Sequence, residues 1–377
     1  MKNPKFHANL AVNSDIVFNR RFRALSTQPE SLLSMTRIIA RPAQLDLDSP
    51  GRRDYWLALE HDSIWGDHLI PLTVWVGPET KPGEGLVSFG SNHGNEFEGP
   101  CVLKNLIREI RTEDVRGRII LIPVLNPSAF RAGTRESSRL DDGVNLNRAF
   151  VDGAGQVPSL SGITHRIANF VREFIWPRVG IVIDLHSGGN VARFSHCANF
   201  HPVEDPVQAA KIEETARWFG TPSLMVYQNV TPGLLPSEAE RLGKITVGTE
   251  LGWGAAVDPV GVRYGRHGVL AALINNGLLK GKIEPIAHHA AGTQRKLEMV
   301  DRDCFTVAPF DGLYEPVLEC GTEVKKGDVV GWLHDFDHID MEPWPARAGV
   351  DGVVLAQAWV AQIPRGQHIV VVGRVLP

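Results

Sequence analysis

Short apolar runs alternate with segments of helical period between about residues 72 and 280. Runs rich in Val, Ile and Leu, which are typical of buried strands, occur at 72–76, 85–90, 118–126, 180–187, 223–229 and 244–251. Between them, apolar residues spaced three and four apart predict helices at 100–111, 161–174, 205–219 and 266–279. Strands that alternate with helices are the signature of a mixed, mostly parallel sheet covered by helices. We therefore predict an α/β fold for this part of the chain.

The pattern changes after about residue 282. Residues 305–335 and 345–373 contain short apolar strands broken by Gly, Pro and Asp, with no helical period. Their two halves, GTEVKKGDVVGWL and DGVVLAQAWVAQIPRGQHIVVV, resemble those of a biotinyl or lipoyl barrel-sandwich. A carrier of that kind needs a lysine at the hairpin tip between the halves, and the joining stretch 334–348 has none. We therefore predict an all-β barrel-sandwich domain with a structural or site-covering role.

These patterns divide the chain into three parts. Residues 285–377 are assigned to the β-domain and residues 51–284 to the α/β domain. Residues 1–50 are an N-terminal extension of uncertain structure, with a strand-like stretch at 37–47.

Composition and charge exclude several classes of protein. The net charge of −4 is small for 377 residues and the basic residues are scattered, so we expect no nucleic-acid partner. The N-terminus has no apolar core behind its lysines, and no run approaches the roughly 18 apolar residues of a membrane span. Four widely spaced cysteines without a CxxC pair are typical of reduced thiols. We expect a cytoplasmic protein that binds no membrane.

The turn GSNHGNEFEGP places a histidine and two glutamates between a strand and a helix. His93 and Glu96 are three residues apart, so a turn entering a helix can direct both side chains at one point, and this ligand pair suits Zn²⁺. A satisfied surface pair would give the same short motif. Pro100 is expected to begin the helix, with Glu98 stabilised near its N-terminus.

A second histidine follows another predicted strand. In IVIDLHSGG, His186 lies at a strand's carboxyl end, where open α/β sheets bind ligands. Together with His93 and Glu96 it makes a three-ligand set that leaves a fourth position open, as in catalytic zinc sites. Asp184 lies on the same face of the strand two residues earlier; it either orients a ligand imidazole or simply caps a neighbouring loop.

Two further segments carry polar groups to strand ends. The loop at 126–150 holds Arg135, Arg148 and the pair Asn145 and Asn147, and a guanidinium can grip a carboxylate or polarise a carbonyl oxygen. Solvated loop arginines are the alternative. In KITVGTELGWG, Glu250 ends an apolar run; it is a candidate to carry protons in hydrolysis, and an ion-pair partner is the alternative.

Taken together and in this order, these pieces resemble the succinylglutamate desuccinylase and aspartoacylase family of zinc amidohydrolases, which have the zinc carboxypeptidase fold. The resemblance runs from about Arg53 to the end and rests on HGNE, NLNR, DLH and TELG. Within the family, DSIWGDHLIPLTV, NHGNEFEGP, NPSAFRAGTRES and the tail PFDGLYEPVLECGTEVKKGDVVG resemble the N-acetyl-diaminobutyrate deacetylases of ectoine degradation.

The resemblance implies a role for each site residue. One Zn²⁺ per chain would be held by His93, Glu96 and His186, with Glu250 as general base and then acid, and Arg135 would polarise the scissile carbonyl.

Substrate binding is implied for a neighbouring pair. Asn147 and Arg148 would hold the substrate carboxylate. Arg139, Asp141 and Asp142, and the stretch VDGAG where a Pro-Gly turn is expected, depart from the subgroup near the substrate loop, so the acyl group and amine can differ.

The function that we predict is zinc-dependent removal of an acyl group from the amine of a small N-acylated amino acid, by metal-activated water. The alternatives are a zinc carboxypeptidase acting on peptides and a non-catalytic binding protein of the same fold. The sequence does not choose among Tyr227, Tyr264 and Tyr314 as donors of a transition-state hydroxyl, and it leaves a homo-oligomer open.

Overall fold

Four parallel strands form the centre of the α/β part of the chain. This computed structural model describes residues 37–61, 65–151, 162–228, 232–286 and 292–377. The four strands pair in the order β5–β4–β6–β10, and their bounds are Gly85–Gly90 (β4), Arg118–Ile122 (β5), Ile181–Leu185 (β6) and Ile245–Glu250 (β10). Their near-continuous apolar sequences follow from burial on both faces.

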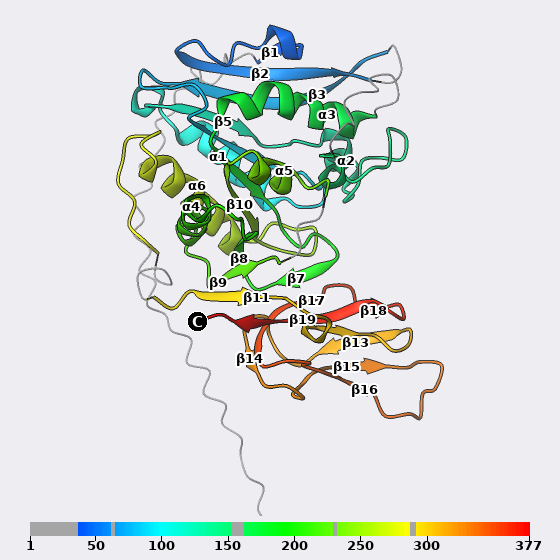
Figure 1. The fold of residues 1–377 in the computed structure, drawn as a ribbon. Helices are drawn as coiled ribbons and strands as arrows, with labels where there is room; N and C mark the ends of the chain where they lie inside the picture. The colour runs from blue at the N-terminus through cyan, green and yellow to red at the C-terminus, as the bar shows by residue number, and fades with distance from the viewer. Residues whose placement is uncertain (1–36, 62–64, 152–161, 229–231, 287–291) are drawn as a thin grey trace, which may run out of the picture. The chain divides into compact units, whose positions relative to one another are not determined.

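Further strands extend this sheet at both edges (Figure 1). Antiparallel β3 joins β5, and β2 and β1 follow it; their bounds are Ile38–Ala40 (β1), Gly51–Glu60 (β2) and Asp67–Val76 (β3). Beyond β10 come β8 (Cys197–Phe200), β9 (Ser223–Val226) and β11 (Arg295–Glu298). The hairpin of β2 and β3 was not expected from the sequence, which indicated only the last residues of β3.

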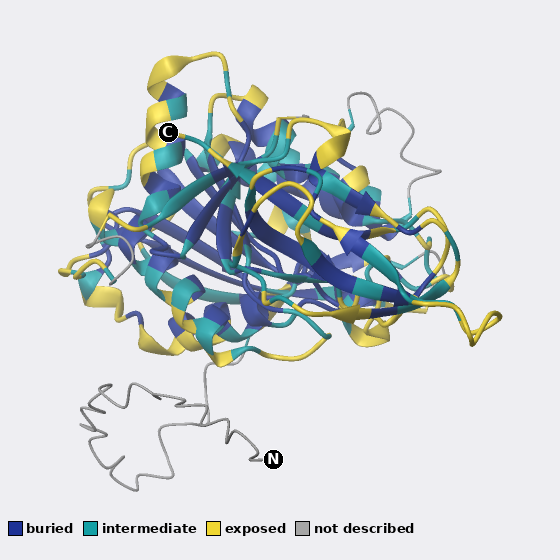
Figure 2. Cartoon of the chain, turned by 90° about the horizontal axis from the view of Figure 1, so that it is seen from below, coloured by how far each residue is buried: buried dark blue, intermediate teal, exposed yellow. Residues whose placement is uncertain are grey.

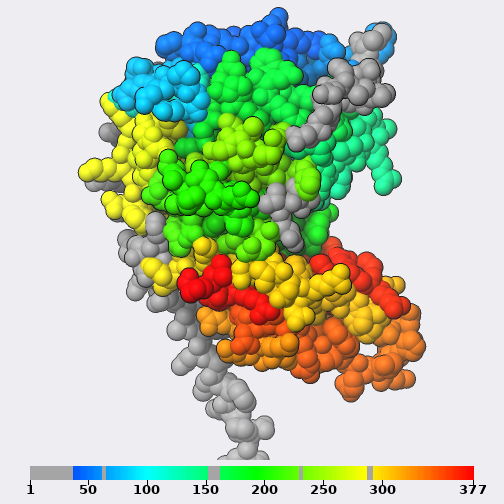
Figure 3. All heavy atoms as spheres, in the orientation of Figure 1, coloured from blue at the N-terminus to red at the C-terminus, as the bar shows by residue number. Residues whose placement is uncertain are grey.

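Helices cover both faces of the sheet, and their bounds are Glu98–Glu109 (α1), Pro127–Ala132 (α2), Ile163–Phe170 (α3), Pro206–Arg217 (α4), Leu235–Arg241 (α5) and Pro259–Asn275 (α6). A π-helical segment, Val171–Ile175, continues α3, so the helix predicted at 161–174 is present as two segments of different helix type. In the space-filling view, the blue N-terminal strands and the green residues of α3 lie side by side (Figure 3).

Adjacent strand residues face two different hydrophobic cores. In β4, Leu86 packs in a cluster with α1, α4 and α6, whereas Val87 packs with α3 and α5 on the other face. Figure 2 shows the same arrangement as buried strands between helices whose outer sides are exposed. This alternation is the period of two that a strand imposes on its side chains.

Three glycines allow α6 to pack closely. An added Cβ would lie 1.6 Å from the Leu251 carbonyl oxygen at Gly261, 2.8 Å from the Leu251 side chain at Gly265 and 2.2 Å from Phe219 at Gly268. Asp258 caps the helix by accepting hydrogen bonds from the amides of its first turn. Because the close approach requires glycine, this part of α6 lacks the apolar period, and the predicted helix began seven residues late.

The C-terminal part is built from two antiparallel groups of strands around a core of its own. One group is the four-stranded sheet β16–β15–β13–β18, and the other pairs β12, β14 and the long strands β17 and β19. The bounds are Phe305–Val307 (β12), Gly312–Pro316 (β13), Glu323–Val324 (β14), Val329–His334 (β15), Trp344–Arg347 (β16), Gly352–Ala358 (β17), Gln362–Ile363 (β18) and His368–Val375 (β19). This architecture confirms the predicted fold class.

Two ladders connect this part to strands that precede it in the chain. β19 pairs with β11, which itself pairs with β9, and β17 pairs with β7 (Ala192–Phe194). The division at residue 285 stays a prediction, and β11 is the strand that bridges it.

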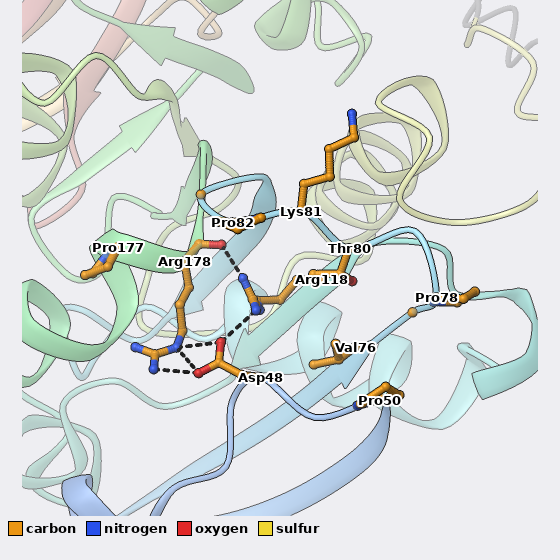
Figure 4. Close-up of a pocket in the computed structure, with 12 residues that line it drawn as sticks. Asp48, Pro50, Val76, Pro78, Thr80, Lys81, Pro82, Arg118, Pro177 and Arg178 are labelled. Carbon is orange, nitrogen blue, oxygen red and sulfur yellow. Dashed lines mark hydrogen bonds and ion pairs between the residues drawn. The ribbon is translucent and has the colours of Figure 1, made fainter.

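A cluster of charges fixes the segment before β2 (Figure 4). Asp48 accepts hydrogen bonds from Arg118 at 2.7 Å and from Arg178 at 2.7 Å, and Arg118 also donates to the Arg178 carbonyl oxygen. These bonds hold the pKa of Asp48 below its ordinary value, with Arg178 as the main cause. The chain is thereby joined to β5 and to the 3-10 turn Trp176–Arg178 that follows the π-helical segment.

Two other sequence predictions concern the cysteines and membrane-spanning helices. The four cysteines are free thiols. In the part of the chain that the structure describes, no helix has both the length and the apolar character needed to cross a bilayer.

Candidate active site

The candidate site lies at the carboxyl ends of β4, β6 and β10, where the sequence placed it. The turn after β4 carries His93 and Glu96, the residue after β6 is His186, and β10 ends in Glu250. Because these strands are parallel neighbours, their carboxyl ends meet at one edge of the sheet.

The turn after β4 has a backbone that few residues tolerate. Ser91 has a φ of 51°, in the left-handed region, and this redirects the chain as it leaves the strand. Gly94 lies against α2, where an added Cβ would be 1.9 Å from the Ala129 carbonyl carbon. Helix α1 begins at Glu98, two residues before the predicted start. The turn and the helix together direct His93 and Glu96 inward.

Three side chains converge on one point. Nδ1 of His93 lies 2.8 Å from Oε1 of Glu96, and Nδ1 of His186 lies 2.9 Å from Oε2. The ring centroids of the two histidines are 4.9 Å apart. One ligand atom from each residue lies within 4.8 Å of the other two. The predicted ligands are therefore close enough to share one ion.

The other nitrogen of each ring also faces an oxygen. Nε2 of His186 lies 2.7 Å from Oδ2 of Asp184, and Nε2 of His93 lies 3.2 Å from Oδ1 of Asn145. Burial favours the neutral form of His93, whose ring has one proton and can satisfy only one of its two oxygen neighbours. A cation at the Nδ1 atoms suits this donor set, because each Nε2–H then donates outward to Asp184 or Asn145. The residues fit a zinc ion. Asp184 faces His186 and also accepts from Nδ2 of Asn92, in the turn after β4, at 2.9 Å, so its carboxylate has a contact of each kind that the sequence left open.

Burial and charge set the titration of this cluster. Burial opposes ionisation of Glu96, but His93 and His186 outweigh it and hold its pKa below the ordinary value. Burial lowers the pKa of His93. Burial also acts to lower the pKa of His186, but Asp184 and Glu96 raise it well above the ordinary value. Glu96 is thus a carboxylate, the form that binds a metal.

Glu250 is a half-buried residue beside this cluster. Burial, and then the charge of Glu96, raise its pKa to about 8, against the opposing effect of His186 and Arg135. Its Oε2 is buried and has no hydrogen-bond partner among the described residues. A carboxyl with a pKa near neutrality and a free oxygen has the properties of a general base.

Arg135 reaches the cluster from the loop after α2. Its Nη1 donates to Oε1 of Glu96 at 3.2 Å, while about a third of its side chain remains exposed. The guanidinium therefore has contact both with the candidate ligands and with solvent, as a group that meets a substrate needs.

The two asparagines of NLNR have different surroundings. Asn145 faces His93, whereas Oδ1 of Asn147 accepts from the Leu235 amide at 2.8 Å and so anchors the start of α5. The side chain of Arg148 is exposed and donates to the Asn147 carbonyl oxygen at 2.6 Å. Asn147 and Arg148 as substrate ligands stay predictions. The stretch VDGAG lies mostly outside the described residues.

The three tyrosines that the sequence could not separate have different surroundings. Burial raises the pKa of Tyr227 well above its ordinary value, and the charge of Glu250 adds to this. The ring of Tyr264 lies 5.5 Å from that of His196 at an angle of 48°, and Tyr314 donates to Gln357 at 2.7 Å in the C-terminal part. Tyr227 is therefore the tyrosine closest in its interactions to the candidate site, and no local pattern in the sequence marks it.

Glu98, which the sequence left without a role, joins the loops after β6 and β10. It is fully buried, and its carboxyl oxygens accept from Ser187 Oγ and from the Asp258 amide. Gly252 leaves room for it, since a Cβ there would lie 1.9 Å from Oε1 of Glu98. Ser187 follows His186 directly, so the hydrogen bond from Ser187 to Glu98 helps to fix the position of a candidate ligand.

Replacement of Glu98 by Ala should therefore lower both stability and turnover. It leaves the partly buried Asp258 amide and the buried Ser187 hydroxyl without their acceptor, and we expect the free energy of unfolding to fall by about 1–3 kcal/mol. Urea unfolding measures the loss, and Glu98→Gln, which keeps one acceptor and one donor, should recover much of it. Wild-type stability in Glu98→Ala would contradict this supporting role.

Comparison with known proteins identifies the family. The model of the succinylglutamate desuccinylase/aspartoacylase catalytic domain matches residues 82–275, which contain all the candidate site residues. The chain belongs to this family. It is 33% identical over 341 residues to the N-alpha-acetyl-L-2,4-diaminobutyric acid deacetylase of Halomonas elongata, which covers 89% of this chain and 95% of that protein.

Solved structures of the family agree with the fold. The product-bound ectoine utilization protein EutE (DoeB) from Ruegeria pomeroyi has a TM-score of 0.79 and 32% identity over 88% of this chain and 97% of that one. A succinylglutamate desuccinylase/aspartoacylase from Rhodobacter sphaeroides has the same TM-score, 0.79, with 30% identity and the same coverage, 88% and 97%. Membership of this family supports an enzyme that hydrolyses amides.

Proposed function

We propose that this chain is a zinc-dependent deacylase that releases the free amine of a small N-acylated amino acid. The observation that carries the proposal is the carboxyl of Glu250, with its buried and unpartnered Oε2 among the described residues, next to the cluster of His93, Glu96 and His186. A metal-binding set and a proton carrier at one point are the two components that hydrolysis of an unactivated amide needs.

His93, Glu96 and His186 would hold the zinc ion. When bound, the ion supplies Lewis acidity, which polarises a carbonyl and lowers the pKa of water. Asp184 and Asn145 fix the two imidazole rings through their Nε2 atoms, so that Nδ1 of each faces Glu96. The binding geometry is thereby set by contacts within the chain before any ion arrives.

Glu250 would move the proton. As a carboxylate it accepts a proton from the attacking water, and as a carboxylic acid it donates that proton to the leaving amine nitrogen. A pKa raised to about 8 makes the second step accessible near neutral pH. Arg135 would donate to the scissile carbonyl oxygen as negative charge develops there.

Asn147 and Arg148 would bind the substrate carboxylate. Arg148 is exposed beside the site loop, and a planar guanidinium offers a carboxylate two parallel hydrogen bonds. The relative from Halomonas elongata suggests N-acetyl-2,4-diaminobutyrate as the first substrate to test.

The test is amine release from a panel of N-acylated amino acids and diamino acids that includes N-acetyl-2,4-diaminobutyrate. We expect turnover of at least one member, its loss after chelation and its recovery when zinc is restored. Parallel reactions with Glu250→Gln exclude a contaminating hydrolase, because a contaminant would survive the substitution.

The outcomes separate the competing functions. Turnover of peptides but of no small amide would replace the proposal with a carboxypeptidase. A fully inert panel, together with a purified protein that binds no zinc, would overturn the hydrolase proposal.

A further inference from the structure

A second group of metal-ligating side chains lies outside the candidate active site. Among the described residues, His61, His68 and Asp141 are the other set whose ligand atoms all lie within 4.8 Å of one another. His61 and His68 come from the β2–β3 hairpin, and Asp141 comes from the loop between Arg135 and Asn145. None of the three has a part in the proposed hydrolysis.

Strand pairing fixes the two histidines on one face of the sheet. Leu59 is paired with His68, and the His61 amide donates to the Gly66 carbonyl oxygen. With a period of two, His61 and His68 are diagonal neighbours on the same face. Their rings stack with centroids 4.8 Å apart and an interplanar angle of 21°. The backbone of a paired hairpin therefore holds both imidazoles in place.

Asp141 is held in a matching orientation by α2. Its Oδ2 accepts from the Ser128 hydroxyl, and Ser128 Oγ in turn accepts from the Ser138 amide at 2.8 Å. This leaves Oδ1 facing the histidines, 3.2 Å from Nε2 of His61 and 3.5 Å from Nε2 of His68. Figure 1 shows α2 and the loop that follows it beside the end of the hairpin. A carboxylate fixed by a hydroxyl on its other oxygen is the usual arrangement around a bound metal.

The spacing of these atoms fits a metal ion. Ligands at about 2.0–2.2 Å from a tetrahedral zinc ion lie about 3.3 Å from one another. The two distances to Oδ1 of Asp141, 3.2 and 3.5 Å, bracket that value. His68 is 6% exposed, whereas about a third of the His61 side chain is exposed, so the set is anchored in the protein and open to solvent on one side.

We propose that His61, His68 and Asp141 form a second site for a divalent transition-metal ion, bound through the two Nε2 atoms and Oδ1. The ligand set of two imidazoles and one carboxylate selects ions such as Zn²⁺ over Mg²⁺ or Ca²⁺, which prefer oxygen alone. An ion bound there ties the β2–β3 hairpin to the loop that carries Arg135 and Asn145. The site does not depend on the proposed hydrolase function.

Counting metal per chain tests the site without measuring activity. Metal is removed from the full-length protein with a chelator, and the protein is dialysed first against zinc and then against zinc-free buffer. Elemental mass spectrometry then gives the number of zinc ions per chain. We expect two zinc ions in the wild type, one in His68→Ala, one in His93→Ala and none in the double variant. His338→Ala removes an exposed histidine that also contacts an aspartate, and as the matched control it should keep both ions.

A second measurement covers variants that fold poorly. In the His93→Ala background, zinc should raise the melting temperature, and the further substitution His61→Ala, at the partly exposed ligand, should remove that rise. X-ray absorption of zinc in His93→Ala should show nitrogen and oxygen ligands at about 2.0–2.2 Å.

Three counts have distinct meanings. Two ions in both the wild type and His68→Ala would overturn the second site, as would a single ion that only His93→Ala removes. A single ion that His68→Ala removes and His93→Ala keeps would support the second site and contradict zinc at the proposed active site.

Discussion

Glu250→Gln should abolish turnover while leaving bound zinc in place. The amide is nearly the same size as the carboxyl but can neither accept the proton from water nor return it to the amine. General acid–base catalysis typically contributes a factor of about 10²–10⁴ to the rate, so we expect kcat to fall at least about 100-fold. Steady-state kinetics on the substrate found in the panel, together with zinc analysis of the same sample, measures both parts of the prediction.

The two readouts distinguish a proton carrier from a structural residue. Loss of zinc together with activity would mean that Glu250 supports the ligands rather than the chemistry. Turnover within a few-fold of the wild type, with zinc retained, would remove Glu250 from the mechanism.

The same substitution should stabilise the metal-free protein at alkaline pH. The carboxyl titrates near 4.5 when unfolded and near 8 when folded, so between these values the folded state binds more protons. Stability that is present below pH 4.5 is therefore lost as the pH rises towards 8, by an amount on the order of a few kcal/mol. Glutamine does not titrate, so this loss should be absent from Glu250→Gln.

Unfolding of metal-free wild type and Glu250→Gln at pH 5 and at pH 8.5 tests the sign. The difference in free energy of unfolding should be small at the lower pH and should favour the variant at the higher one. Metal-free protein is required because the positive charge of an ion would lower the pKa of Glu250. An equal difference at both pH values would contradict the raised pKa.

Glu96→Gln should remove zinc from the candidate active site. Glu96 is the carboxylate that meets Nδ1 of both His93 and His186, and it also accepts from the Ser187 amide at 3.0 Å. Loss of a partner outside the ligand set typically lowers metal affinity about 10–100-fold, and loss of the charged ligand itself should exceed that. Competition with a chromophoric chelator measures the affinity, and turnover should fall with it.

Glu98→Gln is the matched control for this experiment. It makes the same chemical change two residues away, in an equally buried side chain that contacts Ser187 and Asp258 instead of the histidines. It should keep zinc at the His93 site. Equal zinc affinity in Glu96→Gln and the wild type would show that Glu96 is not a ligand.

The convergence of the metal cluster could be predicted because each part of it is encoded locally. The HGNE turn directly follows the apolar run of β4, and DLH and TELG end the apolar runs of β6 and β10. Parallel strands bring their carboxyl ends to one edge, so recognising three strands was enough to bring His93, His186 and Glu250 together.

Other contacts join segments far apart in sequence and leave no local pattern. Asn145 and Asn147 are equivalent in NLNR, and only the packing of the loop turns the first towards His93 and the second towards Leu235. Tyr227 is distinguished by the charges around it, among them Glu250. The supporting bonds of Glu98 span 89 residues to Ser187 and 160 to Asp258.

The sequence by itself determined the α/β core, the all-β C-terminal part and the order of the site residues, because periodicity and strand ends are properties of neighbouring residues. Only the tertiary structure decided that Nε2 of His186 faces Asp184 and that Nε2 of His93 faces Asn145. It also decided how far burial raises the pKa of Glu250. It also placed His61 and His68 beside Asp141, which lies more than seventy residues further along the chain. Burial and electric fields depend on every element that packs around a group, so they exist only once the chain has folded.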